Sequence, residues 1–335
     1  MSIDIKTATI EAKRTTFDHI VEKLGEGKTP TRYQEAVFGH QAEEVFHYRP
    51  TWDSERELFD ARRTAIVMND FEDLLDPRQY YYGTYVIQRS KQRESQEKNF
   101  SVVEKRGLLE DLDAVMKEKI SKVVVPFRHA EWGANNNNYY IAGYGFQTPI
   151  TAAATFQGMD RLANAQYLTS IGLILSSNDP AILDQAKDEW LNTPMWQGLR
   201  KLVEDSFVTK DWFELHVLQN YLLDGVFQPL LFKHFENEVV KNGGAAFAML
   251  TEFFVDWFVE SQRWADSTIK VAVKESDANK ALVESWINKW QPTVIAAADQ
   301  LAEFVFAERS KDIIQQIETE LDARSKKIGI QVQEK

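Results

Sequence analysis

Apolar residues recur every three or four positions along most of this 335-residue chain, the spacing that places them on one face of an α-helix. The pattern runs through four long stretches without proline, which are residues 78–125, 150–179, 195–228 and 230–291. The alternating pattern of a β-strand is absent except for a short candidate at residues 328–332. The sequence therefore predicts an all-α protein.

Prolines and glycines indicate where the predicted helices begin and end. In four places a capping residue precedes proline, which is typical of a helix start because proline at the first helical position loses only an N–H that has no partner there. The four pairs are Asp76-Pro77, Thr148-Pro149, Asp179-Pro180 and Thr193-Pro194. Gly243 and Gly244 are expected to separate two helices, and Pro292 to separate two more within residues 277–326. Glycine, asparagine and tyrosine cluster in residues 128–149, which favours a loop there.

The first 50 residues differ from the rest, since they are polar and are interrupted by glycine and proline. We interpret residues 1–50 as an extended N-terminal arm and residues 51–335 as one helical domain. The alternative for the arm is a disordered terminus. Four aromatic residues in its second half favour docking instead, and these are Tyr33, Phe38, Phe46 and Tyr48.

Two predicted helices carry polar side chains on stripes that are otherwise apolar. The first lies in residues 156–168, and in the second Glu260 shares a face with Trp257 and Trp264, with Arg263 one turn after Glu260. A buried carboxylate or guanidinium costs free energy unless a partner charge, a metal ion or water satisfies it. The identity of that partner decides whether the chain has a chemical site.

Composition excludes several classes of function. The formal net charge of −12 argues against nucleic acid or an anionic membrane as the main partner. The absence of cysteine excludes disulfides, iron–sulfur clusters, thiolate zinc sites and a cysteine nucleophile. The chain has no apolar run long enough for a membrane helix, and its start lacks the apolar core of a signal peptide. We therefore expect a cytoplasmic protein.

Helical proteins of this size often build metal sites between helices, and a di-iron carboxylate centre needs Glu-x-x-His on two of them. Of the six histidines, only His47 has an acidic residue at this spacing, which is Glu44. With 51 acidic residues in 335, chance gives about one such pair, so the match carries no information. The residues indicate the architecture of a di-iron protein without its ligands.

Three longer segments point to a family: HYRPTWDSERELFD (47–60), RHAEWGANNNNYYIAGYG (128–145) and FQGMDRLANAQYL (156–168). They resemble the β subunit of bacterial multicomponent monooxygenases that hydroxylate phenol, toluene or methane, and the phenol hydroxylase branch fits best. The resemblance implies a ferritin-like helical bundle with additional helices, paired with a catalytic α subunit and a small γ subunit in a dimer of protomers. It places the di-iron centre in α, and it adds an effector protein and an NADH-dependent reductase. Such a complex hydroxylates aromatic rings with dioxygen.

The same resemblance identifies six positions where a related α subunit carries metal ligands. In this chain they are occupied by Thr84, Arg161, Asn164, Leu223, Glu260 and Arg263. Asp224 is adjacent to the fourth of them. Guanidinium groups cannot coordinate a cation, so the resemblance implies no catalytic residue, no metal and no cofactor in this chain.

The charged residues at these positions need partners if they are buried. We expect Arg161 and Glu260 to pair across the bundle, in the space that a metal site would occupy, with Asn164 and Arg263 supporting them. A bidentate pair between arginine and a carboxylate would satisfy both groups. The alternative is that these side chains extend to the bundle surface.

A subunit without an active site is expected to serve as a scaffold that docks α, builds the dimer and helps to shape the surface for the effector and the reductase. The arm is expected to wrap α. Aromatic residues are enriched in interface cores, so Tyr48, Trp52, Trp132, Tyr139 and Tyr140 are candidate interface residues, with ordinary core packing as the alternative. Two other functions stay open: a self-sufficient ferritin-like metal-dependent oxidase, and a helical adaptor unrelated to oxygenases.

Overall fold

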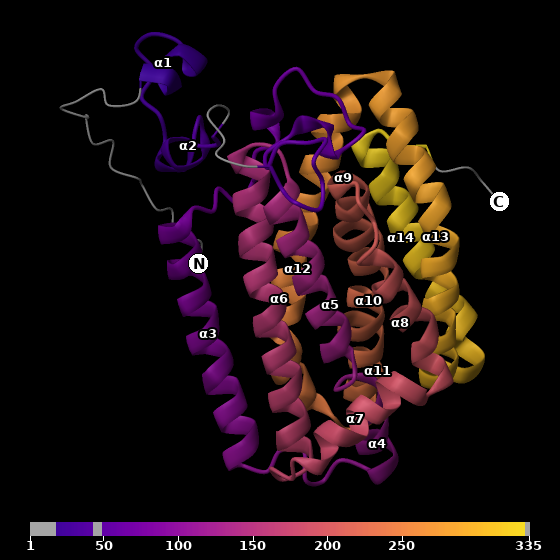
Figure 1. The fold of residues 1–335 in the computed structure, drawn as a ribbon. Coiled ribbons are helices and arrows are strands. Elements are labelled where there is room, and N and C mark those ends of the chain that lie inside the picture. Colours follow the sequence, from indigo (N-terminus) through magenta and orange to yellow (C-terminus); the bar gives the residue numbers. More distant parts are fainter. Residues whose placement is uncertain (1–17, 43–48, 332–335) are drawn as a thin grey trace.

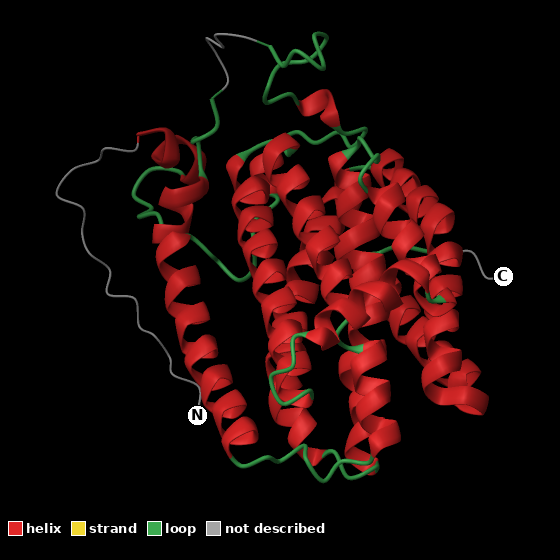
Figure 2. Ribbon diagram, turned by 60° about the horizontal axis from the view of Figure 1, so that its bottom comes forward, coloured by secondary structure: helices red, strands yellow, loops and turns green. Residues whose placement is uncertain are grey.

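A computed structural model describes residues 18–42 and 49–331, and every regular element within these ranges is a helix (Figure 1). Two short helices lie in the arm, α1 (Asp18–Leu24) and α2 (Arg32–Val37). Figure 2 shows the long helices running roughly alongside one another, joined at their ends by loops. The predicted all-α class is confirmed for the described residues.

Most of the body consists of nine long helices and three single 3-10 turns. The helices are α3 (Tyr82–Lys105), α4 (Ala114–Val123), α5 (Phe127–Tyr144), α6 (Thr148–Leu175), α7 (Ala181–Asn192), α8 (Pro194–Ser206), α12 (Ala245–Glu275), α13 (Asp277–Phe306) and α14 (Ser310–Ile328). The 3-10 turns are η1 (Ala61–Arg63), η2 (Phe71–Asp73) and η5 (Ala307–Arg309). Helices α5 and α6 form a closely packed hairpin, while α13 packs against α8, α12 and α14.

A further helical segment passes through the middle of the bundle. It comprises α9 (Trp212–His216), η3 (Val217–Leu223), α10 (Asp224–Pro229), η4 (Leu230–Phe235) and α11 (Glu236–Lys241), of which η3 and η4 are π-helical turns. From residue 215 to residue 232 every side chain is buried. A segment that is buried on all sides belongs in the interior of a large bundle, and this one brings polar side chains such as Gln219, Asp224 and Gln228 into that interior.

The predicted helix boundaries hold where they depend on local sequence. Helices α6, α7 and α8 begin at three of the four capping pairs, and Gly243 with Gly244 separates α11 from α12. The fourth pair does not start a helix. The Asp76 carboxylate does accept from the backbone N–H of Arg78 at 2.8 Å, but Gln79 adopts a positive φ of 54°, which ends the turn, and α3 begins only at Tyr82. Pro292 does not divide its segment, because α13 continues through it and ends at Phe306. The strand candidate is wrong over its described residues, since α14 extends to Ile328 and no strand follows up to residue 331.

The predicted loop at residues 128–149 is also wrong, since most of it is α5. Three asparagines of this segment are buried and have partners for their side-chain N–H groups. Asn135 donates to the carbonyl of Gly158 at 2.7 Å, and Asn137 donates to the hydroxyl of Ser206 at 2.9 Å. Asn138 donates to the carbonyl one turn earlier in its own helix. The two bonds to other helices outweigh the weak local preference of asparagine for turns.

The described part of the arm docks on the same chain. Phe38 and Tyr33 are buried together with Ile20 and Val37, against Leu75 and Tyr81 at the edge of the body. The backbone N–H of Asp76 donates to the Tyr33 hydroxyl at 2.7 Å. These two aromatic residues therefore pack against the body of their own chain. The other predicted arm residues Phe46 and Tyr48, and the pair Glu44 and His47, lie outside the described residues, so wrapping of a partner stays a prediction.

No helix in the described ranges is both long enough and apolar enough to cross a membrane. The cytoplasmic location that we expect from the sequence stays a prediction.

Candidate functional site

A buried arginine occupies the centre of the bundle. Arg161 lies on α6, a largely apolar helix, and its Nη1 donates to both carboxylate oxygens of Glu131 on α5, at 3.1 and 3.2 Å. Its Nη2 donates to the carboxylate of Asp224 on α10. The guanidinium carbon lies 4.4 Å from the centre of the Trp257 ring on α12. One guanidinium therefore joins four helices.

Amide side chains complete the bonding of the two carboxylates. Glu131 also accepts from Asn164 at 3.2 Å and from Gln228 at 2.8 Å. Asp224 accepts from Gln219 at 3.1 Å. Every carboxylate oxygen in this central cluster is thus occupied by an N–H donor, the arrangement that a buried ion pair needs to offset its desolvation.

Burial and charge act against each other on the pKa values of the central cluster. For Arg161 burial alone would lower the pKa, but the charges of Asp224 and Glu131 outweigh it and hold the pKa above its usual range. For Asp224 burial dominates and raises the pKa to about 6, against the lowering effect of Arg161. The favourable charge of Arg161 is thus shared between two carboxylates.

A second network lies beside the first, where α3 meets α6 and α12. Arg89 binds Asp160 in a bidentate pair, with Nε and Nη2 donating at 2.8 and 2.7 Å. Its Nη1 donates to Glu260 at 2.9 Å, and the Tyr80 hydroxyl donates to the same carboxylate at 2.8 Å. The Tyr85 hydroxyl donates to Asp160 at 2.8 Å. Bidentate pairs of this kind are among the stronger polar contacts in proteins.

Trp257 connects the two networks. The guanidinium of Arg161 packs over one face of its ring, and its indole N–H donates to the carboxylate of Asp160 at 3.1 Å. The expected pair between Arg161 and Glu260 is wrong, because each side chain binds a different partner. Arg161 binds Glu131 and Asp224, and Glu260 binds Arg89.

The structure separates the six positions that the resemblance singled out. Arg161 and Asn164 lie in the central cluster, and Leu223 lines a cavity of about 10 Å³ beside it, next to Asp224, which supplies the carboxylate. Thr84 caps the start of α3, where its hydroxyl accepts from the N–H of Tyr81 at 3.2 Å. Glu260 lies in the second network, where it accepts from Arg89. Arg263 lies at the exposed surface of α12. Arg263 therefore does not support Arg161 as we expected, and Thr84 and Glu260 also lie outside the central cluster.

The central cluster does not fit a metal ion. Two carboxylates face each other across the bundle, but the guanidinium between them occupies the position of a cation and repels one. No imidazole takes part, since Asn164 supplies an amide where a histidine ligand would be needed. Across residues 18–42 and 49–331, no three His, Cys, Asp or Glu side chains gather in an arrangement that would hold a metal. The cavity has room for one water at most.

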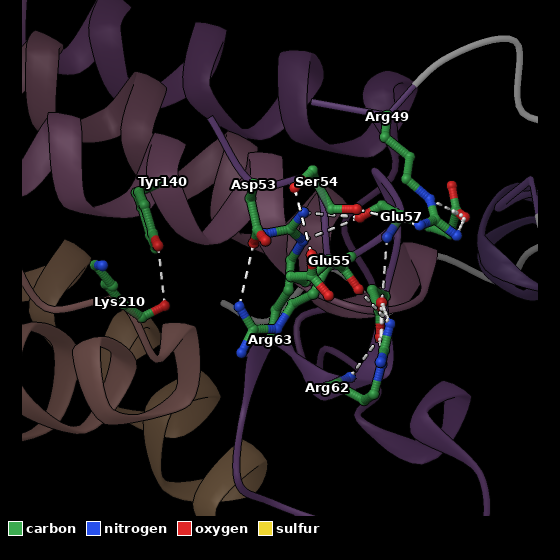
Figure 3. Close-up of polar contacts among 11 residues, drawn as sticks. Arg49, Asp53, Ser54, Glu55, Glu57, Arg62, Arg63, Tyr140 and Lys210 are labelled. Carbon is green, nitrogen blue, oxygen red and sulfur yellow. Dashed lines mark hydrogen bonds and ion pairs between the residues drawn. The ribbon is translucent and has the colours of Figure 1, made fainter. Parts of the chain in front are cut away.

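The candidate interface aromatics differ in exposure. Trp52 is 70% exposed, on a loop held by ion pairs between Arg63 and Asp53 at 2.9 Å and between Arg49 and Glu57 at 2.6 Å (Figure 3). Trp132 and Tyr139 on α5 are also exposed. Tyr140 is half-buried, and its hydroxyl donates to the carbonyl of Lys210 at 2.9 Å, as Figure 3 shows. Tyr48 lies outside the described residues.

Comparison with known proteins identifies the family. The sequence pattern of the methane, phenol and alkene hydroxylases matches residues 49–276, which is more than half of the chain. The chain belongs to the methane/phenol/alkene hydroxylase family. The resemblance to this family that the sequence segments indicated is confirmed.

Individual members of the hydroxylase family match over most of the chain. The sequence is 44% identical over 334 residues to the phenol 2-monooxygenase oxygenase component DmpL of Pseudomonas sp. strain CF600, covering 100% of both proteins. It is 24% identical over 249 residues to the hydroxylase component subunit beta of the toluene-4-monooxygenase system of Ectopseudomonas mendocina, covering 73% of this chain and 74% of that protein. A chain of xenon-pressurized phenol hydroxylase from Pseudomonas sp. OX1 is 42% identical, with a TM-score of 0.91, covering 98% of this chain and 99% of that one. The predicted helical bundle with additional helices is therefore confirmed.

Sequence reasoning missed Glu131, Arg89 and Asp160, which carry most of the two networks in this hydroxylase-family chain. Asp160 could have been found, because it and Arg161 are the only charged residues in the 28 residues of α6. Glu131 was hidden within a segment whose asparagines and glycines favoured a loop. Arg89 lies on α3, where many exposed charges surround it and give no signal.

Proposed function

We propose that this chain is the non-catalytic β subunit of a multicomponent phenol or aromatic hydroxylase. Membership of the hydroxylase family supports an oxygenase component, as do the 44% identity to a phenol 2-monooxygenase oxygenase component and the match to a chain of phenol hydroxylase. The name of the toluene-4-monooxygenase relative, hydroxylase component subunit beta, supports the β assignment.

The observation that carries the non-catalytic role is the position of Arg161. A dinuclear iron site in a helical bundle needs several unoccupied carboxylates and histidines that face one another from four helices. Here the carboxylates of Glu131 and Asp224 do face inward, but Arg161 binds both and neutralises one of their charges. The centre of the bundle is therefore filled by Arg161, and an arginine side chain neither releases its proton in proteins nor coordinates iron.

The partners follow from the same proposal. The iron and the aromatic substrate would bind to a catalytic α subunit, and a small γ subunit would complete each protomer in a dimer of protomers. An effector protein and an NADH-dependent reductase would act on the assembled hydroxylase, which adds oxygen from dioxygen to an aromatic ring. In this complex the chain described here would position the catalytic subunit, and it would hold no cofactor of its own.

Native mass spectrometry of the hydroxylase purified from its own cells tests this proposal. Collisional release of single subunits should give this chain at its apoprotein mass, with iron retained by another chain. The same spectrum should show a complex with two copies of three different chains. Iron that leaves with this chain, at about two atoms per subunit, would overturn the proposal in favour of a self-sufficient oxidase. A purified chain without any iron-containing partner would favour an unrelated adaptor.

A further inference from the structure

A pocket of about 430 Å³ opens between α10, η4, α12 and α14. Its volume lies in the range of about 300–1,000 Å³ that small-molecule sites usually have. The rings of Phe232 and Phe254 are stacked in its wall, with 4.3 Å between their centres. The apolar wall is extended by Phe258, Val255, Val259 and Leu321. A mainly apolar lining with few polar groups is typical of a site for a small organic molecule.

One polar residue of the pocket wall is a buried arginine with incomplete hydrogen bonding. Arg324 on α14 is only 8% exposed. Its Nη2 donates to the carboxylate of Asp266 at 2.7 Å, and its guanidinium carbon lies 4.6 Å from the centre of the Tyr221 ring. Among the described residues no group accepts from its Nε or Nη1, which together carry three N–H groups. Because buried donors without acceptors cost free energy, a ligand that accepts from this guanidinium would be bound favourably.

A buried acceptor belongs to the wall of the same pocket. Gln228 on α10 is buried, and its amide nitrogen donates to the Glu131 carboxylate at 2.8 Å. That carboxylate is paired with Arg161 and can only accept, which fixes the orientation of the Gln228 amide. Its Oε1 has no donor within the part of the chain that the structure describes. Gly225 lies three residues earlier on the same face of α10, and a Cβ atom there would come within 2.6 Å of the Arg324 Nη1, so the unpaired donor lies beside the helix face that carries the unpaired acceptor.

The charged residues around the pocket do not favour an ionic ligand. Lys233 and Glu320 form an exposed pair with each other, and the charge of Arg324 is offset by Asp266. One further carboxylate, that of Glu236, lies in the wall and disfavours an anion. A cation would be repelled by the buried guanidinium. The balance of charge therefore favours an uncharged ligand.

We propose that this pocket binds a neutral phenol-type molecule, whose aromatic ring packs against the phenylalanine wall and whose hydroxyl group accepts from Arg324 and donates to Gln228. A hydroxyl group carries one donor and two acceptor lone pairs, so it satisfies both unpaired groups at once. Aromatic rings pack favourably on other aromatic rings, edge-on or offset, which favours a ring over an aliphatic body. The proposed reaction yields molecules of the same chemical class, but the inference rests on the residues of the pocket and not on the proposed function.

The test titrates phenol into the full-length chain and follows binding by ligand-observed NMR. We expect saturable binding with a Kd of about 1 mM or tighter, as suits a ligand of this size. Toluene has the same shape but offers no donor or acceptor, and it should bind at least about 10-fold more weakly, because the polar groups of the pocket would stay unpaired. Benzoate carries a negative charge and should also bind more weakly than phenol.

Three variants locate the binding. Val259 belongs to the pocket wall and is 55% exposed, so Val259→Trp should fill the pocket, leave the fold intact and abolish phenol binding. Val115→Trp is the matched control, because Val115 on α4 is 61% exposed and lies outside the pocket, and this variant should bind phenol as the parent does. Arg324→Met keeps an extended side chain but removes the donors, so phenol should lose its advantage over toluene.

Four outcomes would overturn the inference. Equal affinities of the parent for phenol and toluene would show a purely apolar cavity, and tighter binding of benzoate would show an anion site. Phenol that does not bind saturably, or that binds Val259→Trp as it binds the parent, would show that the pocket is not a site for it. None of these outcomes bears on the identity of the subunit, which native mass spectrometry tests separately.

Discussion

Replacing Arg161 with leucine is expected to lower the free energy of unfolding by about 3–5 kcal/mol, the usual cost of removing one partner from a buried ion pair. The change removes the bonds to Glu131 and Asp224, and the contact in which the guanidinium carbon lies 4.4 Å from the Trp257 ring centre. It leaves two buried carboxylates with no cation between them. The bonds from Asn164 and Gln228 to Glu131 remain, and they limit the loss to this range.

The assay is equilibrium unfolding of the full-length chain in urea, followed by circular dichroism. A shift of the midpoint without a change of slope would report lost stability alone. Arg93→Leu is the comparison, because Arg93 pairs with Glu97 at 2.7 Å on the exposed side of α3. Exposed pairs of this type contribute only about 0.3–0.5 kcal/mol. An Arg161→Leu chain with the midpoint of the parent would refute the reasoning, since it would mean that the central carboxylates need no cation.

Two further measurements show whether the loss is electrostatic. Combining Arg161→Leu with Glu131→Gln and Asp224→Asn removes the unpaired charges, and stability should return to within about 1–2 kcal/mol of the parent. In Arg161→Leu alone, loss of the cation raises the pKa of Asp224 further above its value of about 6 in the parent. The folded variant then takes up this proton at a higher pH than the folded parent does, so the deficit of the variant should shrink as the pH falls toward about 6. A deficit that does not depend on pH would indicate a packing effect.

Three other changes test separate parts of the structure. Arg89→Met leaves Asp160 and Glu260 without their cation and should cost about 2–4 kcal/mol in the same assay, less than a fully buried pair because Glu260 is partly exposed. Burial lowers the pKa of His216 to about 3 in the folded state. As the pH falls through about 6.5, this histidine is therefore protonated in the unfolded chain but stays neutral in the folded chain. His216 should therefore contribute a loss of about 2 kcal/mol between pH 7 and pH 5, measured as the difference between the pH profiles of the parent and of His216→Gln; parallel profiles would contradict this assignment. Gly133→Ala places a methyl group 2.4 Å from Cγ1 of Val203 and should destabilise by about 1–2 kcal/mol, whereas Gly143→Ala in the same helix meets no atom within 4 Å and should stabilise by about 0.5–1 kcal/mol. Equal effects at the two glycines would show that α5 can move away from α8.

The features that sequence predicts well are those that depend on neighbours along the chain. The three-and-four period of apolar residues and the proline caps at α6, α7 and α8 are local, and they hold in the structure. The helix break predicted at Pro292 is wrong because a long helix that packs on several neighbours tolerates the loss of one backbone hydrogen bond. The asparagines of α5 misled because their partners, such as the carbonyl of Gly158 and the hydroxyl of Ser206, lie on other helices.

The partners of the buried charges could not be predicted, for a geometric reason. Arg161 binds residues that are 30 and 63 positions away, and helix periodicity says nothing about the registers of separate helices. The assignment of Leu223 shows a second limit. The π-helical turn η3 ends at that residue, and a π turn inserts one extra residue into a helix. The resemblance placed the ligand position at Leu223, with Asp224 adjacent, and in the structure the carboxylate that faces Arg161 is that of Asp224.

The charged centre is better explained by structural specificity than by stability. Apolar residues of similar volume are often as stabilising as a buried ion pair, or more so. What Arg161 adds is a single permitted alignment, because sliding α5 or α10 by one turn would separate it from Glu131 or Asp224. Trp257 extends this constraint to α12, and through Asp160 to Arg89 on α3. Two π turns make the central helix irregular, so regular packing alone does not fix how it aligns with its neighbours. The charged centre excludes the alternative alignments.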